Sequence, residues 1–409
     1  MSRLPFPVLV LLSLSLAYSS VYLLPGYLNP PPPVPSLSIV KSANHAYGAA
    51  LAGNNSGING GDRGGDEPVA VFVGGTSGIG RAMAESFAHH TKGRGRMVLV
   101  GRNERTAHAI LSSTSSSSNA KNQFIPCDLA NSTSLSLCID ALSTLPKINY
   151  LILTPGYFSL HPHSDAIPSS KDRQVDSKLM VHYYARWKLI HDLASLLEGA
   201  TALGEDGKVL TVSRPGWGGR ANLYDLGLNR TYGAIAASLQ MPTYNDFMIE
   251  SFALLHPSLT FINAYPGFVR TPLLSSSPTL RELSSYPFPV PALAASLVAL
   301  AEVMTYPLSR SAEECAEWMW RGVWSSSRAS NGKYGENVKG YFPSYVAEKI
   351  VDVSGKVKEK HVSHKTGSAG IEGAFRLGAY GEDLGSQRSF GTEDARRMVW
   401  EHTESVMSA

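Results

Sequence analysis

The chain has 409 residues, of which 43% are hydrophobic and 17% charged, so it is long enough to bury a sizeable core in one large domain or two smaller ones. Its formal net charge of +3 comes from 36 basic and 33 acidic residues of mixed distribution, which excludes the strongly basic surface that nucleic-acid binding requires. The three cysteines, Cys127, Cys138 and Cys315, fit neither a disulfide framework nor a zinc motif, so we predict no metal.

Residues 1–24 form a hydrophobic N-terminal segment. Between Phe6 and Leu24 there is no charged residue, and this run of 19 residues is just long enough to span a bilayer. We favour a signal-anchor, through which residues 6–24 would associate with the endoplasmic reticulum membrane or enter the secretory pathway. A cleaved signal peptide, with Ala17-Tyr18-Ser19 as its small-residue cleavage site, is the second interpretation. A segment that engages no membrane, in a cytoplasmic protein, is the third.

Three N-x-S/T sequons would make the chain a glycoprotein only in a lumenal compartment, and they begin at Asn54, Asn131 and Asn229.

Residues 25–67 are predicted to form a linker rich in proline and glycine. Asn29–Pro35 is a stiff polyproline II spacer, Ser36–Ala52 has the pattern of an amphipathic helix, and Gly53–Glu67 is a flexible stretch. We therefore expect one domain over residues 68–274 and a C-terminal extension over residues 275–409.

A strand, a glycine-rich turn and a helix follow one another from Val69 to His90. Val69–Val73 is a short apolar run typical of a buried strand, and Arg81–His89 has helical spacing. The glycines between them follow the pattern G-x-x-x-G-x-G. Such a turn places a pyrophosphate on a helix N-terminus, where backbone N–H groups lack partners and the macrodipole favours an anion. The residues predicted to bind the cofactor here are Gly74, Thr76, Ser77, Gly78, Ile79 and Gly80.

The second strand, Arg96–Val100, ends in Gly101-Arg102-Asn103. A site that prefers NAD usually carries an acidic residue near this position, on the ribose 2′-hydroxyl. Arg102 would instead neutralise a 2′-phosphate through charge-assisted hydrogen bonds. We therefore predict NADP as the cofactor, with Arg102 and Asn103 in its site; a solvated surface arginine is the alternative.

Further strands alternate with helical segments such as Ser132–Leu142 and Asp176–Leu197. This alternation predicts an α/β fold with a doubly wound parallel sheet, a Rossmann fold, whose ligands lie at the carboxyl ends of the strands. The further strands are Phe124–Pro126, Ile148–Leu153, Lys208–Val212 and Leu259–Ala264.

The glycine turn resembles the cofactor loop of the short-chain dehydrogenase/reductase superfamily, T-G-x-x-x-G-x-G, with Val73 in place of the threonine. The resemblance covers about Val69 to Leu274. It implies that an Asp-Leu pair contacts the adenine edge and that the Pro-Gly and Thr after the sixth strand contact the nicotinamide carboxamide and the diphosphate. The residues placed in the cofactor site on this basis are Asp128, Leu129, Gly156, Pro266, Gly267, Val269 and Thr271. For Asp128, an N-cap of the following helix is the alternative, and both roles are compatible.

The family's catalytic Ser and Tyr-x-x-x-Lys are not in place. Arg214 stands at the serine position, and counting back from Pro266 puts the tyrosine position near Ser238 and the lysine position near Pro242. The lysine matters because its charge lowers the tyrosine pKa from ~10. The remaining catalytic candidates are Ser213 and Tyr244.

Packing is the alternative role for Tyr244, and also for Tyr232, another tyrosine that could substitute. Tyr184 and Lys188 have the Y-x-x-x-K spacing but precede the fifth strand, so we predict a structural role for both. His182 stands where the family's asparagine usually kinks this helix.

The C-terminal extension is expected to be helical. Ala292–Met304 is apolar and too short to span a membrane, which favours a substrate lid, with membrane-surface contact as the alternative. The other helices are expected at Ser311–Arg321 and Thr392–Ser405.

The main hypothesis is an NADP(H)-dependent oxidoreductase that transfers a hydride to or from a small hydrophobic carbonyl or alcohol. The layout resembles a divergent, fungal-type branch of the superfamily associated with secondary metabolism. The alternative is a non-catalytic NADP-binding protein, a sensor or partner subunit. An isomerase or dehydratase on the same frame is the third hypothesis, and we make no prediction of oligomeric state.

Overall fold

The computed structural model describes residues 34–53, 67–114, 121–159, 166–168, 174–273, 275–326, 347–351, 357–361, 371–385 and 391–407. Residues 1–24, with the signal-anchor and cleavage-site predictions, lie outside this set, as does Asn54. Within the described ranges, no helix combines the length and the apolar character needed to cross a bilayer.

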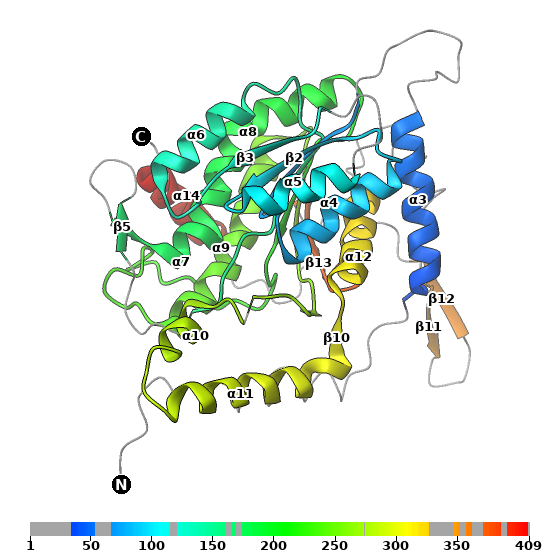
Figure 1. Ribbon diagram of the computed structural model, residues 1–409. Coiled ribbons are helices and arrows are strands. Elements are labelled where there is room, and N and C mark those ends of the chain that lie inside the picture. The colour runs from blue at the N-terminus through cyan, green and yellow to red at the C-terminus, as the bar shows by residue number, and fades with distance from the viewer. Residues whose placement is uncertain are drawn as a thin grey trace, which may run out of the picture.

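Seven parallel strands form the central sheet, in the order β13-β8-β7-β4-β1-β2-β3 (Figure 1). The strands are β1 Val69–Val73, β2 Arg96–Gly101, β3 Gln123–Pro126, β4 Tyr150–Leu153, β7 Lys208–Val212, β8 Thr260–Ala264 and β13 Ala374–Leu377. The chain runs outward from β1 in both directions, so the strand order reverses between β1 and β4. This topology confirms the predicted doubly wound fold, and the reversal is where such sheets bind ligands.

The central strands of the sheet are buried on both faces, which explains why they are mostly apolar. All five residues of β1 and of β8 are buried. One face packs against α4 (Gly78–His90), α5 (Glu104–Thr114) and α12 (Ala312–Ser325). The other face packs against α6 (Ser132–Leu142), α8 (Ala185–Ala202), α9 (Ala234–Leu255) and α14 (Glu393–Met407).

Part of the predicted linker is a helix that belongs to the body of the molecule. Helix α3 (Leu37–Gly53) packs against α4 and α12. The Asn44 amide donates to Glu317 Oε2 over 2.7 Å, and the Tyr47 hydroxyl donates to Asp206 Oδ2 over 3.0 Å. Val40, Asn44 and Tyr47 are buried at helical spacing, so the amphipathic helix predicted at Ser36–Ala52 is confirmed, whereas its place in a linker is wrong.

The boundary predicted at residue 274 is also wrong. Strand β13 pairs with β8, Ala374 opposite Phe261, and thereby adds the seventh strand to the sheet. Helix α12 buries Trp318, Trp320 and Trp324 beneath the same sheet. The C-terminal part of the chain therefore completes the Rossmann core, because α12, β13 and α14 are all built into it.

Shorter elements connect these layers. The predicted helix Asp176–Leu197 is interrupted: α7 (Ser177–Leu179) passes into a π-helix, η2 (Met180–Tyr184), before α8 begins. The short strands are β5 Ala166–Pro168 with β6 Gln174–Asp176, β9 Phe268–Val269 with β10 Ser309–Arg310, and β11 Ala347–Val351 with β12 Val357–His361.

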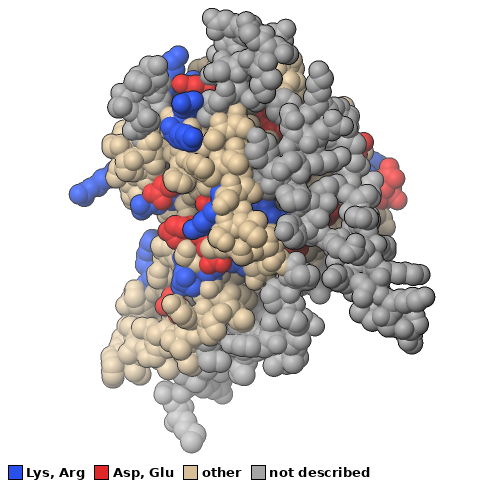
Figure 2. All heavy atoms as spheres, turned by 90° about the vertical axis from the view of Figure 1, so that its right-hand side faces the viewer, with Lys and Arg blue, Asp and Glu red and all other residues tan. Residues whose placement is uncertain are grey.

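Helices α10 (Pro278–Leu283) and α11 (Val290–Thr305) stand apart from the body, below it in Figure 1, with η3 (Tyr306–Leu308) after them. The predicted helix Ala292–Met304 is thereby confirmed as α11. Its exposed apolar side chains include Leu300 and Val303. In Figure 2 acidic and basic residues are interspersed over the middle of the described surface, while the tan area at the lower left shows few charged residues.

Candidate cofactor and active site

The glycine turn lies at the carboxyl end of β1 and leads directly into α4. Gly74 and Gly78 have φ angles of +82° and +52°, in the region that favours glycine. A Cβ at Gly80 would collide with Thr154 Oγ1 and with the Gly74 carbonyl group. Glycine is therefore required where the helix starts so close to the turn and to the end of β4.

The first turn of α4 offers backbone donors at the surface. The N-cap residue, Ser77, has an extended backbone and makes no side-chain cap bond, so its hydroxyl satisfies none of the first N–H groups of the helix. Thr76 and Ile79 are half-buried on either side of the exposed Ser77. Unpaired N–H groups at a helix N-terminus suit an anion, so the donors present here fit a diphosphate.

The chain after β8 returns to this turn. A Cβ at Gly78 would lie 3.3 Å from Thr271 Cγ2, so these two predicted cofactor residues, far apart in sequence, are neighbours. Gly267 has a φ of +73° in the turn that follows Pro266, and Val269 pairs in β9 with Arg310 of β10. The structure thus brings the predicted diphosphate and nicotinamide segments together at one edge of the sheet.

Arg102 follows the end of β2, beside the same turn. A Cβ at the neighbouring Gly101 would lie 3.0 Å from Thr76 Oγ1. Arg102 itself is exposed. The side-chain oxygen of Asn103 accepts a hydrogen bond from the Thr106 backbone N–H over 3.0 Å at the start of α5. Asn103 therefore has a capping role that its sequence position did not reveal.

The Asp128-Leu129 pair follows β3. Asp128 Oδ1 accepts a hydrogen bond from the Ala130 N–H over 3.1 Å, and Leu129 is buried. The N-cap of α6 is Asn131, whose side chain accepts from the Ser134 N–H over 2.9 Å. The alternative role of Asp128 as the helix cap is therefore wrong, and its contact with an adenine stays a prediction.

Gly156, after β4, lies against His182. A Cβ at Gly156 would be 2.8 Å from His182 Cε1, and His182 Nε2 lies 3.1 Å from both the backbone N and the carbonyl O of Tyr157. Burial lowers the pKa of His182 to about 3, with a further contribution from the charge of Arg186, so this imidazole is neutral. The π-helix η2 places His182 at this strand end, as the family's kinked helix places its asparagine.

Ser213 stands at the end of β7 in a buried polar network. Its hydroxyl donates to Asn263 Oδ1 over 2.6 Å, and the Asn263 amide donates to Asp246 Oδ1 over 2.8 Å. Asp246 Oδ2 also accepts from the Gly216 N–H and lies 3.5 Å from Arg376 Nη1. The Ser213 hydroxyl is thus already hydrogen-bonded, in a network that connects the ends of β7 and β8 to α9.

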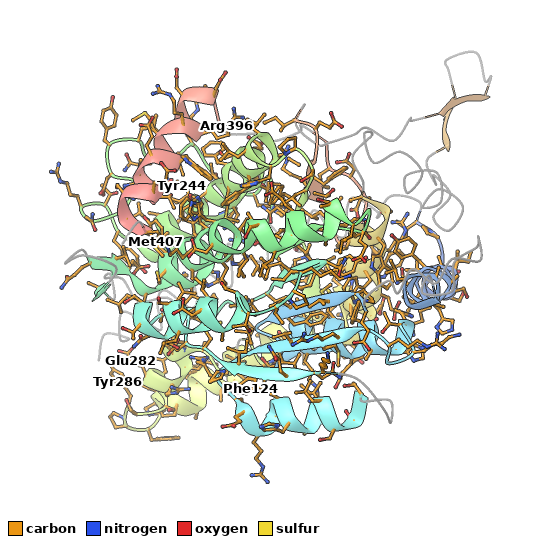
Figure 3. All side chains as sticks on the ribbon, turned by 90° about the horizontal axis from the view of Figure 1, so that it is seen from above. Phe124, Tyr244, Glu282, Tyr286, Arg396 and Met407 are labelled. Carbon is orange, nitrogen blue, oxygen red and sulfur yellow. The ribbon has the colours of Figure 1, made fainter. Side chains whose placement is uncertain are left out.

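Tyr244 lies in the core beneath α14 (Figure 3). It is 0% exposed, and its hydroxyl donates to the Leu226 carbonyl over 2.9 Å. Burial raises the pKa of Tyr244 well above its ordinary value, which is the opposite of what proton transfer at neutral pH requires. This placement corrects the sequence-based choice of Tyr244 as a catalytic candidate. Tyr232 packs against the same core.

The three positions that carry Ser, Tyr and Lys in the family form a structural joint here. Pro242 lies inside α9 and has no N–H, so it cannot donate to the carbonyl of Ser238, four residues earlier. Arg214 Nη2 donates to that Ser238 carbonyl over 3.4 Å. The arginine at the serine position therefore supplies a hydrogen bond that the proline at the lysine position removes.

Two buried cations near this joint were not identified from the sequence. Lys178 on α7 is 6% exposed and its ammonium donates to the Ser159 carbonyl over 3.0 Å. Burial lowers the pKa of Lys178 to about 8; the charge of Asp176 opposes this shift and that of Arg214 adds to it. A lone lysine at the start of a helix gives no sequence signal for such burial, because most lysines are exposed.

Arg186 on α8 is the second buried cation. Its guanidinium donates to the Pro155 carbonyl after β4, and to Thr211 Oγ1 and the Val212 carbonyl of β7. Burial lowers its pKa to about 9. One side chain thereby joins the ends of two neighbouring strands at the edge where the candidate site lies.

The structural role predicted for Tyr184 and Lys188 is confirmed. The Tyr184 hydroxyl is buried and lies 2.9 Å from His402 Nε2 on α14. Lys188 Nζ forms a surface ion pair with Asp192 Oδ2 at 3.0 Å. The two side chains therefore do not act together as a catalytic pair.

Known proteins resemble this chain in sequence. The family model described as short chain dehydrogenase matches residues 68–213. Oxidoreductase AN1596 of Emericella nidulans is 26% identical over 344 residues, which cover 83% of this chain and 92% of that protein. Oxidoreductase andH of Emericella variicolor is 26% identical over 242 residues, which cover 59% of this chain and 65% of that protein.

Solved structures show a similar but more distant likeness. The crystal structure of the KRED1-Pglu enzyme is 16% identical, with a TM-score of 0.43 over 62% of this chain and 93% of that one. L-sorbose reductase from Gluconobacter frateurii, solved with NADPH and L-sorbose, is 19% identical, with a TM-score of 0.41 over 62% and 89% of the two chains.

The strand order, the glycine turn at its switch point and the family match lead to one assignment. The match over residues 68–213, together with the strand order and the oxidoreductases that resemble the chain in sequence, supports a member of the short-chain dehydrogenase/reductase superfamily. The family match ends at Ser213, directly before Arg214, the first of the positions at which the expected catalytic residues are replaced.

Proposed function

We propose that the chain is an NADP(H)-dependent reductase or dehydrogenase for a small hydrophobic carbonyl or alcohol. The observation that carries the proposal is the convergence of Gly78, at the start of α4, with Thr271, from the segment after β8. Retaining both cofactor segments at one edge of the sheet supports hydride transfer, because positioning the nicotinamide is most of what the protein contributes to that reaction.

In this proposal each group of residues has a separate task. The N–H groups at the start of α4 hold the diphosphate, Arg102 holds the 2′-phosphate, and Thr271 holds the nicotinamide end. When bound, the cofactor supplies or accepts the hydride. The proposed cofactor residues are those predicted from the sequence, with Asn103 acting through its cap of α5.

The proton is assigned to Lys178. Tyr244 is sealed in the core and Ser213 donates to Asn263, so neither supports proton transfer to a substrate. Lys178 carries an ionisable group with a pKa near neutrality and lies within electrostatic range of Arg214 at the end of β7. We infer that Lys178 and Arg214 bind the substrate oxygen and that Lys178 exchanges the proton.

The apolar helix α11 supports a hydrophobic substrate. After α11 the chain returns to the candidate site, because β10 pairs with β9 beside Thr271. Exposed apolar side chains on a helix attached at this edge fit a lid that closes over an apolar molecule. A role in secondary metabolism stays a prediction.

The second candidate function is a non-catalytic NADP-binding protein. The observation that favours it is the contact of Arg214 with the Ser238 carbonyl, which turns the usual catalytic positions into a structural joint. The two candidates agree on cofactor binding and differ only in turnover.

One experiment on the full chain tests the cofactor and separates the two candidates. We expect Arg102→Glu to weaken NADPH binding at least about tenfold, with NADH binding little changed, because one charge-assisted contact to a phosphate is lost. The matched control is Arg105→Glu, which changes an exposed arginine at the second residue of α5. Calorimetry gives both affinities, and oxidation of NADPH is then followed with a panel of apolar ketones.

The outcomes are distinct. Turnover supports the oxidoreductase, whereas NADPH binding without turnover of any ketone favours the non-catalytic protein. If neither dinucleotide binds, both candidates are wrong, and an unchanged preference in Arg102→Glu removes the 2′-phosphate assignment alone.

A further inference from the structure

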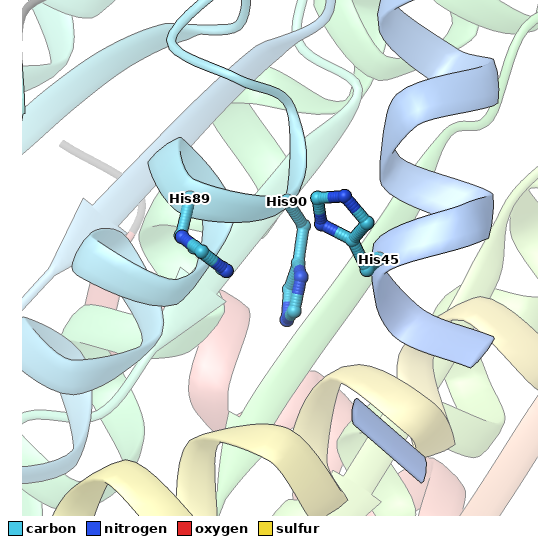
Figure 4. A group of neighbouring side chains, drawn as sticks. All are labelled: His45, His89 and His90. Atoms are coloured by element: carbon cyan, nitrogen blue, oxygen red, sulfur yellow. The ribbon is translucent and has the colours of Figure 1, made fainter. Parts of the chain in front are cut away.

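Three histidines meet where α3 packs against the C-terminal end of α4. His45 comes from α3, and His89 and His90 are the last two residues of α4 (Figure 4). One ring nitrogen from each lies within 4.8 Å of the other two. The ring centroids are 5.3–6.0 Å apart. His45 and His89 are exposed, whereas His90 is 2% exposed.

His90 is the member of this group that points to a ligand. Its Nε2 lies 3.0 and 3.1 Å from the two carboxylate oxygens of Glu317 on α12. Its Nδ1 is buried and has no hydrogen-bond partner among the described residues. A carboxylate accepts only, so Nε2 carries the proton and Nδ1 presents a lone pair. A buried acceptor left unpaired destabilises the folded chain, and a bound cation would remove that penalty.

Glu317 is itself held in place by hydrogen bonds from α3 and α4. The Asn44 amide donates to its Oε2 over 2.7 Å and the Ser86 hydroxyl to its Oε1 over 3.1 Å. A carboxylate behind a histidine in this way fixes the tautomer and orients the ring, as it does behind metal-binding histidines.

The packing of α3 is what brings His45 to the other two histidines. A Cβ at Gly48 would lie 2.6 Å from the Cβ of His90, so only glycine allows the two helices to approach this closely. The close approach of the two helices therefore places a His45 ring nitrogen within 4.8 Å of ring nitrogens of His89 and His90.

We propose that His45, His89 and His90 bind one divalent transition-metal cation, Zn²⁺ by preference, with water as the fourth ligand. Three imidazoles without a carboxylate suit Zn²⁺ and its neighbours rather than Mg²⁺ or Ca²⁺. Tetrahedral Zn²⁺ with bonds of about 2.0–2.1 Å needs ligand nitrogens roughly 3.3 Å apart. Rotation of the two exposed side chains, His45 and His89, closes the separation present here.

This site is separate from the cofactor site. The glycine turn is at the first residue of α4 and the histidines at the last, roughly 18 Å away along a helix of this length. A cation bound by both helices would fasten α3 to α4. The expected consequence is therefore stability of the N-terminal helix rather than participation in hydride transfer.

The test uses the full chain without a polyhistidine tag, after removal of metal by a chelator and dialysis. Zn²⁺ is titrated against a competing chromophoric chelator and, separately, by calorimetry. We expect one Zn²⁺ per chain and a higher melting temperature when it binds. His45→Ala and His89→Ala are exposed changes that leave the core intact, and each should weaken Zn²⁺ binding at least about tenfold.

The matched control is His108→Ala, an exposed histidine on α5 outside the group. It should bind Zn²⁺ as the unmodified chain does. Glu317→Gln tests the supporting carboxylate and should weaken binding by about 10–100-fold, with circular dichroism used to verify the fold. Absence of stoichiometric binding, or equal affinity in His45→Ala, His89→Ala and His108→Ala, overturns the proposal.

Discussion

Arg186 holds a position at which one side chain supports two strand ends. Its guanidinium is buried and donates to the carbonyls of Pro155 and Val212, which close β4 and β7 beside the candidate site. The sequence shows only an arginine on an otherwise apolar helix. Its role is structural because parallel strands end at the same edge of the sheet. There the planar guanidinium can donate to several of their last carbonyls at once.

We predict that Arg186→Met destabilises the chain by about 3–5 kcal/mol, because the partly buried carbonyls and the buried Thr211 hydroxyl would lose this donor. Arg220→Met, which removes an exposed arginine, should change the free energy of unfolding by less than about 0.5 kcal/mol. Urea denaturation measures both. Equal stabilities of the two variants would contradict the role assigned to Arg186.

Lys178 leads to a prediction about rate rather than stability. If its ammonium delivers the proton during carbonyl reduction, kcat should fall as the pH rises through about 8, where the group loses its proton. Lys178→Met should lose about 10²–10⁴ in kcat together with this pH dependence. Lys188→Met, which removes a surface ion pair with Asp192, serves as the control. A Lys178→Met enzyme with an unchanged pH profile would remove Lys178 from the mechanism.

At the scale of elements, an ion pair connects α14 to α9. The surroundings of its carboxylate, Glu250, disfavour the charged form. Arg396 Nη1 on α14 lies 3.5 Å from Glu250 Oε2 on α9. Burial and the nearby Asp246 raise the pKa of Glu250 to about 7, and Arg396 and Arg376 only partly offset them. Between pH 4.5 and about 7 the folded chain therefore keeps a proton that the unfolded chain releases.

Stability should consequently fall as the pH rises through this window, because there the folded state binds more protons than the unfolded state. We predict that Glu250→Gln removes up to about 3 kcal/mol of this fall between about pH 5 and about pH 8. Denaturation curves at several pH values measure it. Glu401→Gln, an exposed carboxylate on α14, should keep the full pH dependence; if Glu250→Gln also keeps it, the assignment fails.

The elements that the sequence predicted well are those whose pattern is local. The apolar run of β1, the glycine spacing after it and the helical period of α4 each appear within a few residues, and all three are where the sequence placed them. Strand β13 was missed because its residues, Ala-Phe-Arg-Leu, are too few to show a period and lie in a region rich in glycine and charge. Its strand character comes from pairing with β8, which lies over a hundred residues earlier.

At the scale of the whole molecule, the described part of the chain forms packed layers, and the α10–α11 segment stands apart from them (Figure 1). Strands β9 and β10 pair on either side of that segment, so its two ends lie next to each other. We predict that replacing residues 275–305 with a linker of about six glycine and serine residues preserves folding and NADPH binding but abolishes turnover of apolar substrates.

A chain ending at residue 273 gives the contrasting result. It lacks α12, β13 and α14, so one edge of the sheet and part of both hydrophobic cores would be uncovered. We expect it to be unfolded or aggregated by circular dichroism and size-exclusion chromatography. Independent folding of this shorter chain would restore the domain boundary that the sequence suggested.

The sequence by itself determined the fold class, the superfamily and the glycine turn with Arg102 beside it, because each depends on residues close together in the chain. The tertiary structure decided which side chains are available for chemistry. In the folded chain Ser213 donates a hydrogen bond to Asn263, and Tyr244 and Lys178 are buried. Three histidines from two helices lie next to one another. Burial and partners depend on segments far apart in sequence, and they decide whether a polar group is reactive, structural or a ligand.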